Sequence, residues 1–244
     1  MHCRQCMGGD HNLCPQGVGT IVGRHGGFAD RVRCHWAWAT PIPAGLDPVY
    51  AGPLFCGGIT VFNPIVQDRI TPTMRVGVVG IGGLGHIALQ LLNAWGCEVT
   101  AFTSSASKVE EAKKLGAHKT ADSKDAAAMK NLAGAFDMLL VTVNASLDWD
   151  ALLGTLAPKG ILHIVGAVLE PIPVQAMSLI MQQRGIVGSP LGSPNTTAAL
   201  LDFCVRHGVK PVIERFPMSK VNEAIAHLEA GKARYRIVLE NDFD

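Results

Sequence analysis

A glycine pattern that follows an apolar strand and opens a helix constrains this chain more than any other feature. Residues 75–86 read RVGVVGIGGLGH, so Gly80, Gly82 and Gly85 form Gly-x-Gly-x-x-Gly. The first glycine permits a tight turn, the second lets the backbone approach phosphates, and the third lets the helix pack closely on a sheet. The free amides at the helix N-terminus would face the anion. The pattern predicts a pyrophosphate cradle, whose other loop residues are Ile81, Gly83 and Leu84.

The residues around the glycines strengthen this interpretation, which the pattern alone would not carry, because 27 of the 244 residues are glycine. Residues 76–79 form an apolar, mostly β-branched run. After the glycines, apolar residues recur at helical spacing until Gly96, which can end the helix. The alternative is a glycine-rich turn from strand to helix that binds no ligand.

The end of the next predicted strand indicates which dinucleotide is bound. A site that prefers NAD usually has an Asp or Glu about 20 residues after the glycines, which bonds the ribose 2′-hydroxyl. Here residues 97–102 lead into TSSASK, and Glu98 lies at the beginning of the strand. Hydroxyl groups and one lysine suit a 2′-phosphate, which predicts NADP(H). The residues of this phosphate site are Thr103, Ser104, Ser105 and Lys108.

Residues 107–110, SKVE, have a second interpretation as a capping box that starts the following helix. Both interpretations can hold, because the capped start of a helix also attracts anions.

Strands and helices continue to alternate after the cradle. Further strands are predicted at 119–121, 138–143, 160–165 and 185–189, and helical connections around 124–133, 149–156 and 174–182. Continuous apolar strands such as 138–143 are typical of parallel sheets covered on both faces. The pattern predicts an α/β doubly wound sheet. Two helices at 198–205 and 221–228 and a closing strand at 235–239 follow, while residues 1–56, rich in glycine and proline, suit a loop-rich or all-β module.

Composition limits the partners and the compartment. A hydrophobic content of 48% in 244 residues indicates a substantial core in one large or two small domains. A net charge of +1 gives no electrostatic case for nucleic acid or a membrane surface. The longest apolar stretches, such as 161–169, are shorter than the ~20 residues of a spanning helix, and no signal peptide opens the chain. Seven cysteines, an odd number, favour reduced thiols and metal binding in the cytoplasm.

Three cysteines near the N-terminus have the spacing of metal ligands. Cys3, Cys6 and Cys14 are separated by two and seven residues, and their thiolates can share one Zn²⁺. A structural zinc site has four ligands, so the fourth could be water, chloride, His2 or His11, or the site could stay empty. A lone thiol such as Cys56 is ordinarily a small buried hydrophobe.

Taken together, the cysteine lobe, Cys56 in AGPLFCGGIT and the glycine cradle resemble the zinc-dependent alcohol dehydrogenases of the medium-chain dehydrogenase/reductase superfamily. Within that superfamily the chain is most similar to the NADP-dependent cinnamyl-alcohol-dehydrogenase-like branch. The resemblance implies a Rossmann doubly wound parallel sheet plus an incomplete GroES-like β-rich catalytic domain. The implied boundaries are 1–56 for part of the catalytic domain with its zinc lobe, 57–192 for the NADP-binding domain and 193–244 for the return to the catalytic domain.

The same resemblance implies roles for individual residues. Cys3, Cys6 and Cys14 match the last three cysteines of the family's structural zinc lobe, whose first cysteine would fall one residue before Met1. Cys56 matches the third ligand of the catalytic zinc, and the other ligands lie upstream in the family. We therefore expect an N-terminally truncated member that lacks part of its active site. The residues that match the nicotinamide side are Thr142, Gly166, Ser189, Pro190 and Leu191.

Residues 188–193 resemble a strand that pairs across a dimer interface, which implies a homodimer. His86 is expected to be a helix residue rather than a base, and His163 has no recognisable constellation. The predicted function is zinc-dependent hydride transfer between NADP(H) and a primary alcohol or aldehyde. The alternatives are an inactive NADP(H)-binding protein and a zinc-independent quinone or enone reductase.

Overall fold

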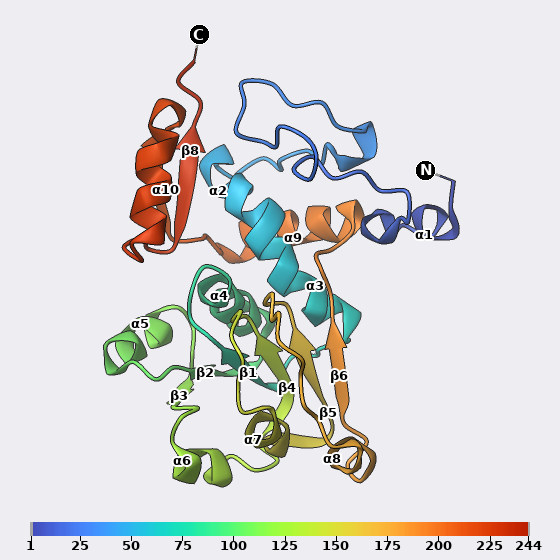
Figure 1. Cartoon of the computed structure of the whole chain (residues 1–244), viewed down its shortest axis with the longest axis vertical. Coiled ribbons are helices and arrows are strands. Elements are labelled where there is room, and N and C mark those ends of the chain that lie inside the picture. The colour runs from blue at the N-terminus through green and yellow to red at the C-terminus, as the bar shows by residue number, and fades with distance from the viewer. Residues whose placement is uncertain (1, 244) are drawn as a thin grey trace. The chain divides into compact units, whose positions relative to one another are not determined.

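The computed structural model describes residues 2–243, which form two compact units. Thr60–Pro190 make up one unit, called the sheet unit below. Met1–Ile59 and Leu191–Asp244 make up the other, called the flanking unit. The elements of both units are labelled in Figure 1.

A parallel sheet of six strands organises the sheet unit, in the order β3-β2-β1-β4-β5-β6. This is the order of a dinucleotide-binding Rossmann sheet, in which the order of the parallel strands reverses between β1 and β4. The predicted parallel α/β sheet is therefore confirmed. The strands are β1 Arg75–Val79, β2 Glu98–Phe102, β3 Lys119–Ala121, β4 Phe136–Val141, β5 Leu156–Ile164 and β6 Gly185–Gly188.

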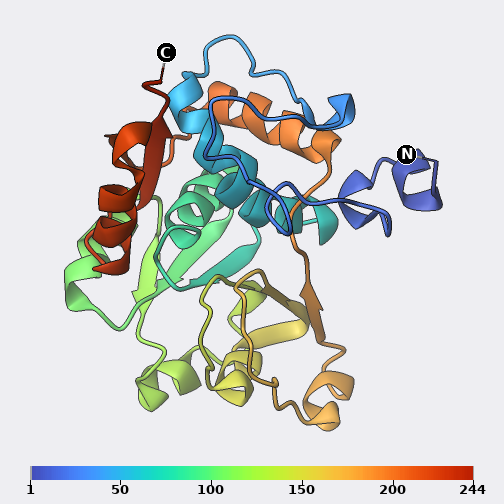
Figure 2. The same ribbon diagram turned by 45° about the horizontal axis from the view of Figure 1, so that its top comes forward.

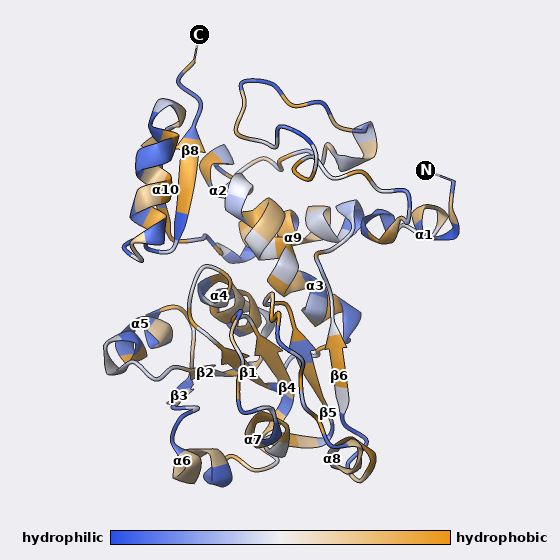
Figure 3. Ribbon diagram, viewed as in Figure 1, coloured by the Kyte–Doolittle hydropathy of each residue, from blue (hydrophilic) through white to orange (hydrophobic). Residues whose placement is uncertain are grey.

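Helices lie on both sides of this sheet, with α4 and α7 on opposite sides (Figures 1 and 2). One core cluster joins the strand residues Leu139 and Val141 to Trp149 of α7. The central strands are almost wholly hydrophobic, as the colouring of Figure 3 shows, because both of their faces are covered. The helices of this unit are α3 Ile59–Gln67, α4 Gly85–Trp95, α5 Val109–Lys114, α6 Ala126–Asn131, α7 Trp149–Gly154 and α8 Ala176–Ile180.

The predicted capping box at the start of α5 is wrong. A 3₁₀ turn, Ala106–Lys108, precedes the helix, and Lys108 is the N-cap residue without a side-chain capping bond. The Ser107 hydroxyl instead lies 2.8 Å from the Ser105 hydroxyl. The serine side chain is used inside the loop, so it does not cap the helix.

Helices and turns dominate the flanking unit. Its helices are α1 Arg4–Met7, α2 Pro48–Pro53, α9 Pro194–His207 and α10 Val221–Glu229, and its strands β7 Ile213–Pro217 and β8 Arg236–Glu240 form a parallel pair. Within the described residues 2–56 no strand forms, so a loop-rich segment is correct and an all-β module is wrong. Glycine and proline interrupt this segment too often for regular pairing. β7 was not predicted.

The sequence analysis did not predict one long helix. Pro48–Gln67 runs through α2, a π-helical segment at Leu54–Gly58, and α3. It is long and apolar enough to cross a membrane, but 61% of its most apolar window is buried inside the structure. That burial is typical of the core helix of a water-soluble fold.

Candidate functional site

The glycine loop after β1 has the geometry of a phosphate cradle. Gly80 has a φ of +93°, which glycine adopts without strain. A Cβ on Gly85 would lie 1.9 Å from the carbonyl oxygen of Gly80, so this glycine is required for close packing. A Cβ on Gly82 would meet no atom within 4 Å. Packing within the protein therefore does not explain Gly82, whereas a ligand that approaches the backbone would.

Two neighbouring side chains hold this loop in place. The Thr142 hydroxyl, at the end of β4, lies 2.8 Å from the carbonyl oxygen of Gly80 and 3.0 Å from that of Val79. His86 is fully buried, and its Nδ1 lies 3.0 Å from the carbonyl oxygen of Gly82. The ring of His86 therefore belongs to the hydrogen bonding of the loop itself.

The loop after β2 reaches the same cradle. Lys108 Nζ donates to the carbonyl oxygen of Ile81 at 3.3 Å. The hydroxyl of Thr103 accepts from the backbone N–H of Ser105 at 3.2 Å. Glu98 lies at the opposite end of β2, where it pairs with Lys119 at 2.8 Å. The loop after β2 thus offers a lysine and hydroxyl groups beside the cradle. Glu98, the carboxylate of β2, lies at the other end of the strand.

The carboxyl ends of the parallel strands gather the predicted cofactor residues of the sheet unit at one edge. The loops at 80–85 and 103–108, Thr142, Gly166 and the segment 189–190 all follow such an end. A Cβ on Gly166 would lie 1.8 Å from the carbonyl oxygen of Val143, so the chain passes close to β4 there. Ligands of this fold bind at this edge, where the strand order reverses. Leu191 is the first residue of the second segment of the flanking unit.

Sequence reasoning missed a buried group of polar side chains in the sheet unit. His163 of β5 is fully buried, and its Nδ1 lies 2.5 Å from Asp68 Oδ2 at the end of α3. Its Nε2 lies 2.9 Å from the hydroxyl of Ser189, just after β6. The expectation that His163 belongs to no constellation is wrong. A lone histidine within an apolar strand was the available signal, because a buried polar group needs a partner.

The three N-terminal cysteines come together as the spacing predicts. All three sulfur atoms lie within 4.8 Å of one another, and those of Cys3 and Cys14 are 3.8 Å apart. Zn–S bonds of about 2.3 Å in a tetrahedron give a sulfur–sulfur distance of about 3.8 Å, so the thiols fit zinc. Within residues 2–243 neither His2 nor His11 joins this group, and His11 Nδ1 lies 3.1 Å from the carbonyl oxygen of Gly9.

Local contacts give two thiols of this cluster different pKa values. The backbone N–H of Cys6 donates to Cys3 Sγ and lowers the pKa of Cys3. Burial, followed by the other two thiols, raises the pKa of Cys6 to about 11. Cys6 therefore becomes a thiolate less readily than Cys3, and a bound cation would favour its ionised form.

Cys56 lies in the π-helical segment of the flanking unit and is exposed. The guanidinium of Arg236 lies beside it, since a Cβ on the adjacent Gly57 would be 2.3 Å from Arg236 Nη2. Burial lowers the pKa of Arg236, and the charge of Cys56 opposes that shift. Among the described residues Cys56 belongs to no group of three potential ligands. A catalytic zinc normally has three protein ligands, so the residues present here do not fit one.

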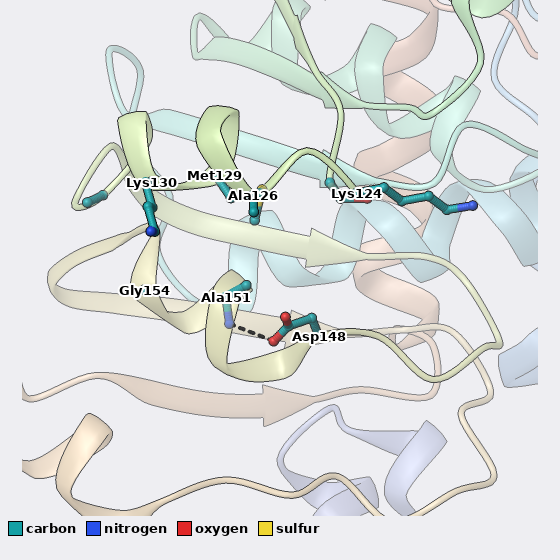
Figure 4. Close-up of a pocket in the computed structure, with 9 residues that line it drawn as sticks. Lys124, Ala126, Met129, Lys130, Asp148, Ala151 and Gly154 are labelled. Carbon is teal, nitrogen blue, oxygen red and sulfur yellow. Dashed lines mark hydrogen bonds between the residues drawn. The ribbon is translucent and has the colours of Figure 1, made fainter.

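A separate pocket of about 450 Å³ lies beside α6 and α7 (Figure 4). Asp148 accepts a bond from the backbone N–H of Ala151 at 3.0 Å and so caps α7 there. Lys124 and Lys130 also line the pocket. None of the predicted cofactor or metal residues does.

Comparison with known proteins identifies the family. The family model described as zinc-binding dehydrogenase matches residues 83–206. Aldehyde reductase AdhA of Synechocystis is 54% identical over 241 residues, which cover 99% of this chain and 72% of that protein. The chain belongs to the zinc-binding dehydrogenases. NADP-dependent alcohol dehydrogenase C 1 of Mycolicibacterium smegmatis is 35% identical to this dehydrogenase over 248 residues, covering 98% of the chain and 71% of the relative.

A solved structure supports the same assignment. A cinnamyl alcohol dehydrogenase of Sorghum bicolor superimposes on this dehydrogenase with a TM-score of 0.84 and 36% sequence identity, over 97% of this chain and 70% of the sorghum chain. The resemblance to the cinnamyl-alcohol-dehydrogenase-like branch is therefore confirmed. The dehydrogenase is a member of the family of NADP-dependent alcohol dehydrogenases and aldehyde reductases. The roles of single residues, the GroES-like domain and the dimer stay predictions.

Proposed function

We propose that the dehydrogenase interconverts primary alcohols and aldehydes with NADP(H), which the sheet unit binds at the carboxyl edge of its strands. The observation that carries the proposal is the pairing of the open backbone at Gly82 with Lys108, which stands over the same loop. The first offers room for a pyrophosphate, and the second offers a charge for a 2′-phosphate.

Each part of the dinucleotide has residues suited to it. The amides of 80–85 would bind the pyrophosphate, and Thr103, Ser104, Ser105 and Lys108 the 2′-phosphate. Lys108 now bonds one neutral carbonyl oxygen, a partner that a phosphate oxygen can replace. Because the 2′-phosphate belongs to the adenosine half, the nicotinamide half would extend toward β4, β5 and β6. Thr142, Gly166, Ser189, Pro190 and Leu191 are its proposed neighbours.

The chemistry follows from the bound cofactor. NADP(H) supplies or accepts the hydride, and the protein orients it. The aldehyde as substrate is supported by the name of the Synechocystis relative, an aldehyde reductase. The cysteine cluster is proposed to hold a structural Zn²⁺. Cys56 would supply one of the three protein ligands that a catalytic zinc takes, and the described residues bring no other two to it.

The domain and assembly predictions belong to the same proposal. Residues 57–192 would form the NADP-binding domain, while 1–56 and 193–244 would form part of a GroES-like catalytic domain. β6 ends one side of the sheet, so its free backbone groups are available to a second copy, which favours a homodimer. All seven cysteines are free thiols, which favours the cytoplasm.

A second candidate function is NADP(H) binding without turnover. The observation that favours it is that, among the described residues, no group of three potential zinc ligands includes Cys56. This candidate requires the same cofactor site, so binding and turnover must be measured separately.

Cofactor binding is the first test, with NADPH and NADH titrated against the chain by calorimetry. We expect Lys108→Ala to weaken NADPH binding by about 10- to 100-fold, the worth of a hydrogen bond between charged groups, with NADH nearly unaffected. Lys114→Ala, which removes an exposed lysine from α5, is the matched control. Equal losses for both cofactors would refute the 2′-phosphate site.

The variant Gly82→Ala tests the pyrophosphate cradle. The added methyl group meets no protein atom, so the melting temperature should stay unchanged while both cofactors bind more weakly. Reduction of a primary aldehyde by NADPH, followed at 340 nm, then decides between the two candidate functions. Tight NADPH binding without oxidation would favour the binding protein.

A further inference from the structure

The side chain of Thr142, at the end of β4, bonds the backbone where β1 ends and the glycine turn begins. Its hydroxyl oxygen lies 2.8 Å from the carbonyl oxygen of Gly80 and 3.0 Å from that of Val79. The backbone N–H of Thr142 also donates to the carbonyl oxygen of Val79, at 3.0 Å. A Cβ on Gly80 would lie 3.2 Å from the hydroxyl oxygen and one on Gly85 would lie 3.4 Å from it. The hydroxyl thus lies between the first and the third glycine of the cradle.

The direction of these hydrogen bonds does not depend on any protonation state. A carbonyl oxygen can only accept, so the hydroxyl of Thr142 must donate its one hydrogen to Gly80, to Val79 or to both. The hydroxyl therefore has no hydrogen to donate to a ligand. What it does instead is fix the direction of the carbonyl group of Gly80.

A fixed carbonyl group at Gly80 also fixes the amide that follows it. The peptide bond between Gly80 and Ile81 is trans, so its C=O and N–H groups point in opposite directions. The C=O points to β4, so the N–H of Ile81 points to the other side of β1, where β2 lies. Among the described residues this N–H has no hydrogen-bond partner, although Ile81 is only 5% exposed. Buried backbone N–H groups rarely lack a partner, which points to a ligand as the acceptor.

We propose that Thr142 is a positioning residue which holds the amide of Ile81 toward the pyrophosphate of the cofactor. This inference rests on the proposed function, which assigns the pyrophosphate to the amides of 80–85. It makes the phosphates, and not the nicotinamide ring, the part of the cofactor that Thr142 serves. Gly80 permits the turn, and the hydroxyl of Thr142 selects the direction of its peptide group.

The test compares Thr142→Val, which removes the donor, with Thr142→Ser, which keeps it. Calorimetry should show NADP⁺ binding weakened about five- to tenfold by Thr142→Val, the worth of one neutral hydrogen bond, and changed less than about twofold by Thr142→Ser. Thr155→Val is the matched control, because the buried hydroxyl of Thr155 donates to the carbonyl oxygen of Leu152 at 2.8 Å, just before β5. It should lower the melting temperature by about 2–4 °C, as Thr142→Val does, without changing NADP⁺ binding.

Two smaller ligands show which part of the cofactor Thr142 serves. 2′-Phospho-ADP-ribose has the pyrophosphate but no nicotinamide, and Thr142→Val should weaken its binding by the same factor as that of NADP⁺. 2′-AMP has the 2′-phosphate but no pyrophosphate, so its binding should not change. A loss confined to NADP⁺ would assign Thr142 to the nicotinamide ring and overturn the proposal. An equal loss for 2′-AMP would mean that the substitution disturbs the whole edge, which overturns it as well.

NMR of the chain labelled with nitrogen-15 isoleucine observes the Ile81 amide directly, and the loss of one signal in Ile81→Val identifies it. Its proton signal should move downfield when 2′-phospho-ADP-ribose binds, because a phosphate oxygen then accepts from it. 2′-AMP should leave the signal in place. The movement should be smaller in Thr142→Val. A signal that does not move in the unmodified chain, although the ligand binds, overturns the proposal.

Failure of the proposed function gives a different result. If neither NADP⁺ nor 2′-phospho-ADP-ribose binds the unmodified chain, the cofactor site is refuted, and this inference with it. If both bind, and Thr142→Val binds them equally well, the cofactor site stands and the role of Thr142 alone is overturned. Binding by Thr142→Ser as weak as that by Thr142→Val would show that the hydroxyl is not the cause, which also overturns the proposal.

Discussion

In the sheet unit the apolar residues of the strands are inside, whereas in the first part of the flanking unit large apolar side chains lie at the surface. Leu140 in β4 is 0% exposed, while Val22 and Trp36 are 87% and 81% exposed. The sheet unit therefore has a core of its own. The first 45 residues of the flanking unit have a thiol cluster and turns instead. The comparison teaches that burial of apolar side chains stabilises the sheet unit, whereas the first part of the flanking unit has a thiol cluster that a bound metal ion would stabilise.

Core truncation should show the largest difference between the units. Leu140→Ala removes buried methyl groups from the centre of the sheet and should lower the free energy of unfolding by about 2–5 kcal/mol. Val22→Ala removes exposed methyl groups and should change it by less than about 0.5 kcal/mol. Urea unfolding followed by circular dichroism measures both. Similar losses for the two variants would break the comparison.

Metal binding should act on the flanking unit alone. Zn²⁺ should order the segment that contains Cys3, Cys6 and Cys14, and slow its amide hydrogen exchange by at least about tenfold, or about 1.4 kcal/mol. Exchange in β1 and β4 should not change. Cys6→Ser should abolish the effect, and Cys34→Ser, outside the cluster, should preserve it. Protection that persists in Cys6→Ser would mean that the zinc binds elsewhere.

A smaller effect should come from the ion pair between Arg75 and Asp137 in the sheet unit. The two side chains are 42% and 32% exposed, and the hydrogen bond from Arg75 lowers the pKa of Asp137 below its ordinary 3.8. A lowered pKa contributes stability that is present above the ordinary value and disappears as the pH falls through the lower folded-state pKa. Because water screens this pair, Asp137→Asn should cost about 0.5–1 kcal/mol at pH 7, and progressively less as the pH falls below the folded-state pKa of Asp137.

The matching pair in the flanking unit sharpens this prediction. Arg215 bonds Glu240 across β7 and β8, and that bond lowers the pKa of Glu240. Both residues are on the surface, so Glu240→Gln should leave the unfolding midpoint unchanged at pH 7. A larger effect for Glu240→Gln than for Asp137→Asn would reverse the expected order.

Local signals predicted the sheet unit well. The cradle, the alternation of strands and helices and the helix from Gly85 follow from glycine positions and apolar runs that each lie within a few residues. The structure of residues 1–56 and the strand β7 were harder to predict, because glycine and proline indicate turns but not what those turns pack against. The long helix at 48–67 was not predicted, and Pro53 and Pro64 lie inside it, because tertiary packing overrides the tendency of proline to break a helix.

The candidate site shows the same division between local and distant information. The thiol cluster could be predicted, because eleven positions separate its first and last members. Asp68 and His163 are 95 positions apart, and Ser189 is a further 26 away. No periodicity links residues at such separations. Only the pairing of β5 with β6 and the end of α3 bring them together.

The four tryptophans are divided evenly between the two units, which makes the chain its own optical reporter. Trp149 is buried, and Trp95 donates its indole N–H to the carbonyl oxygen of Ile70, so the sheet unit should emit at short wavelength and resist quenching. Trp36 and Trp38 are exposed and should emit at long wavelength, within reach of iodide. A single emission spectrum, with and without quencher, can thus follow the folding of each unit separately in the undivided chain.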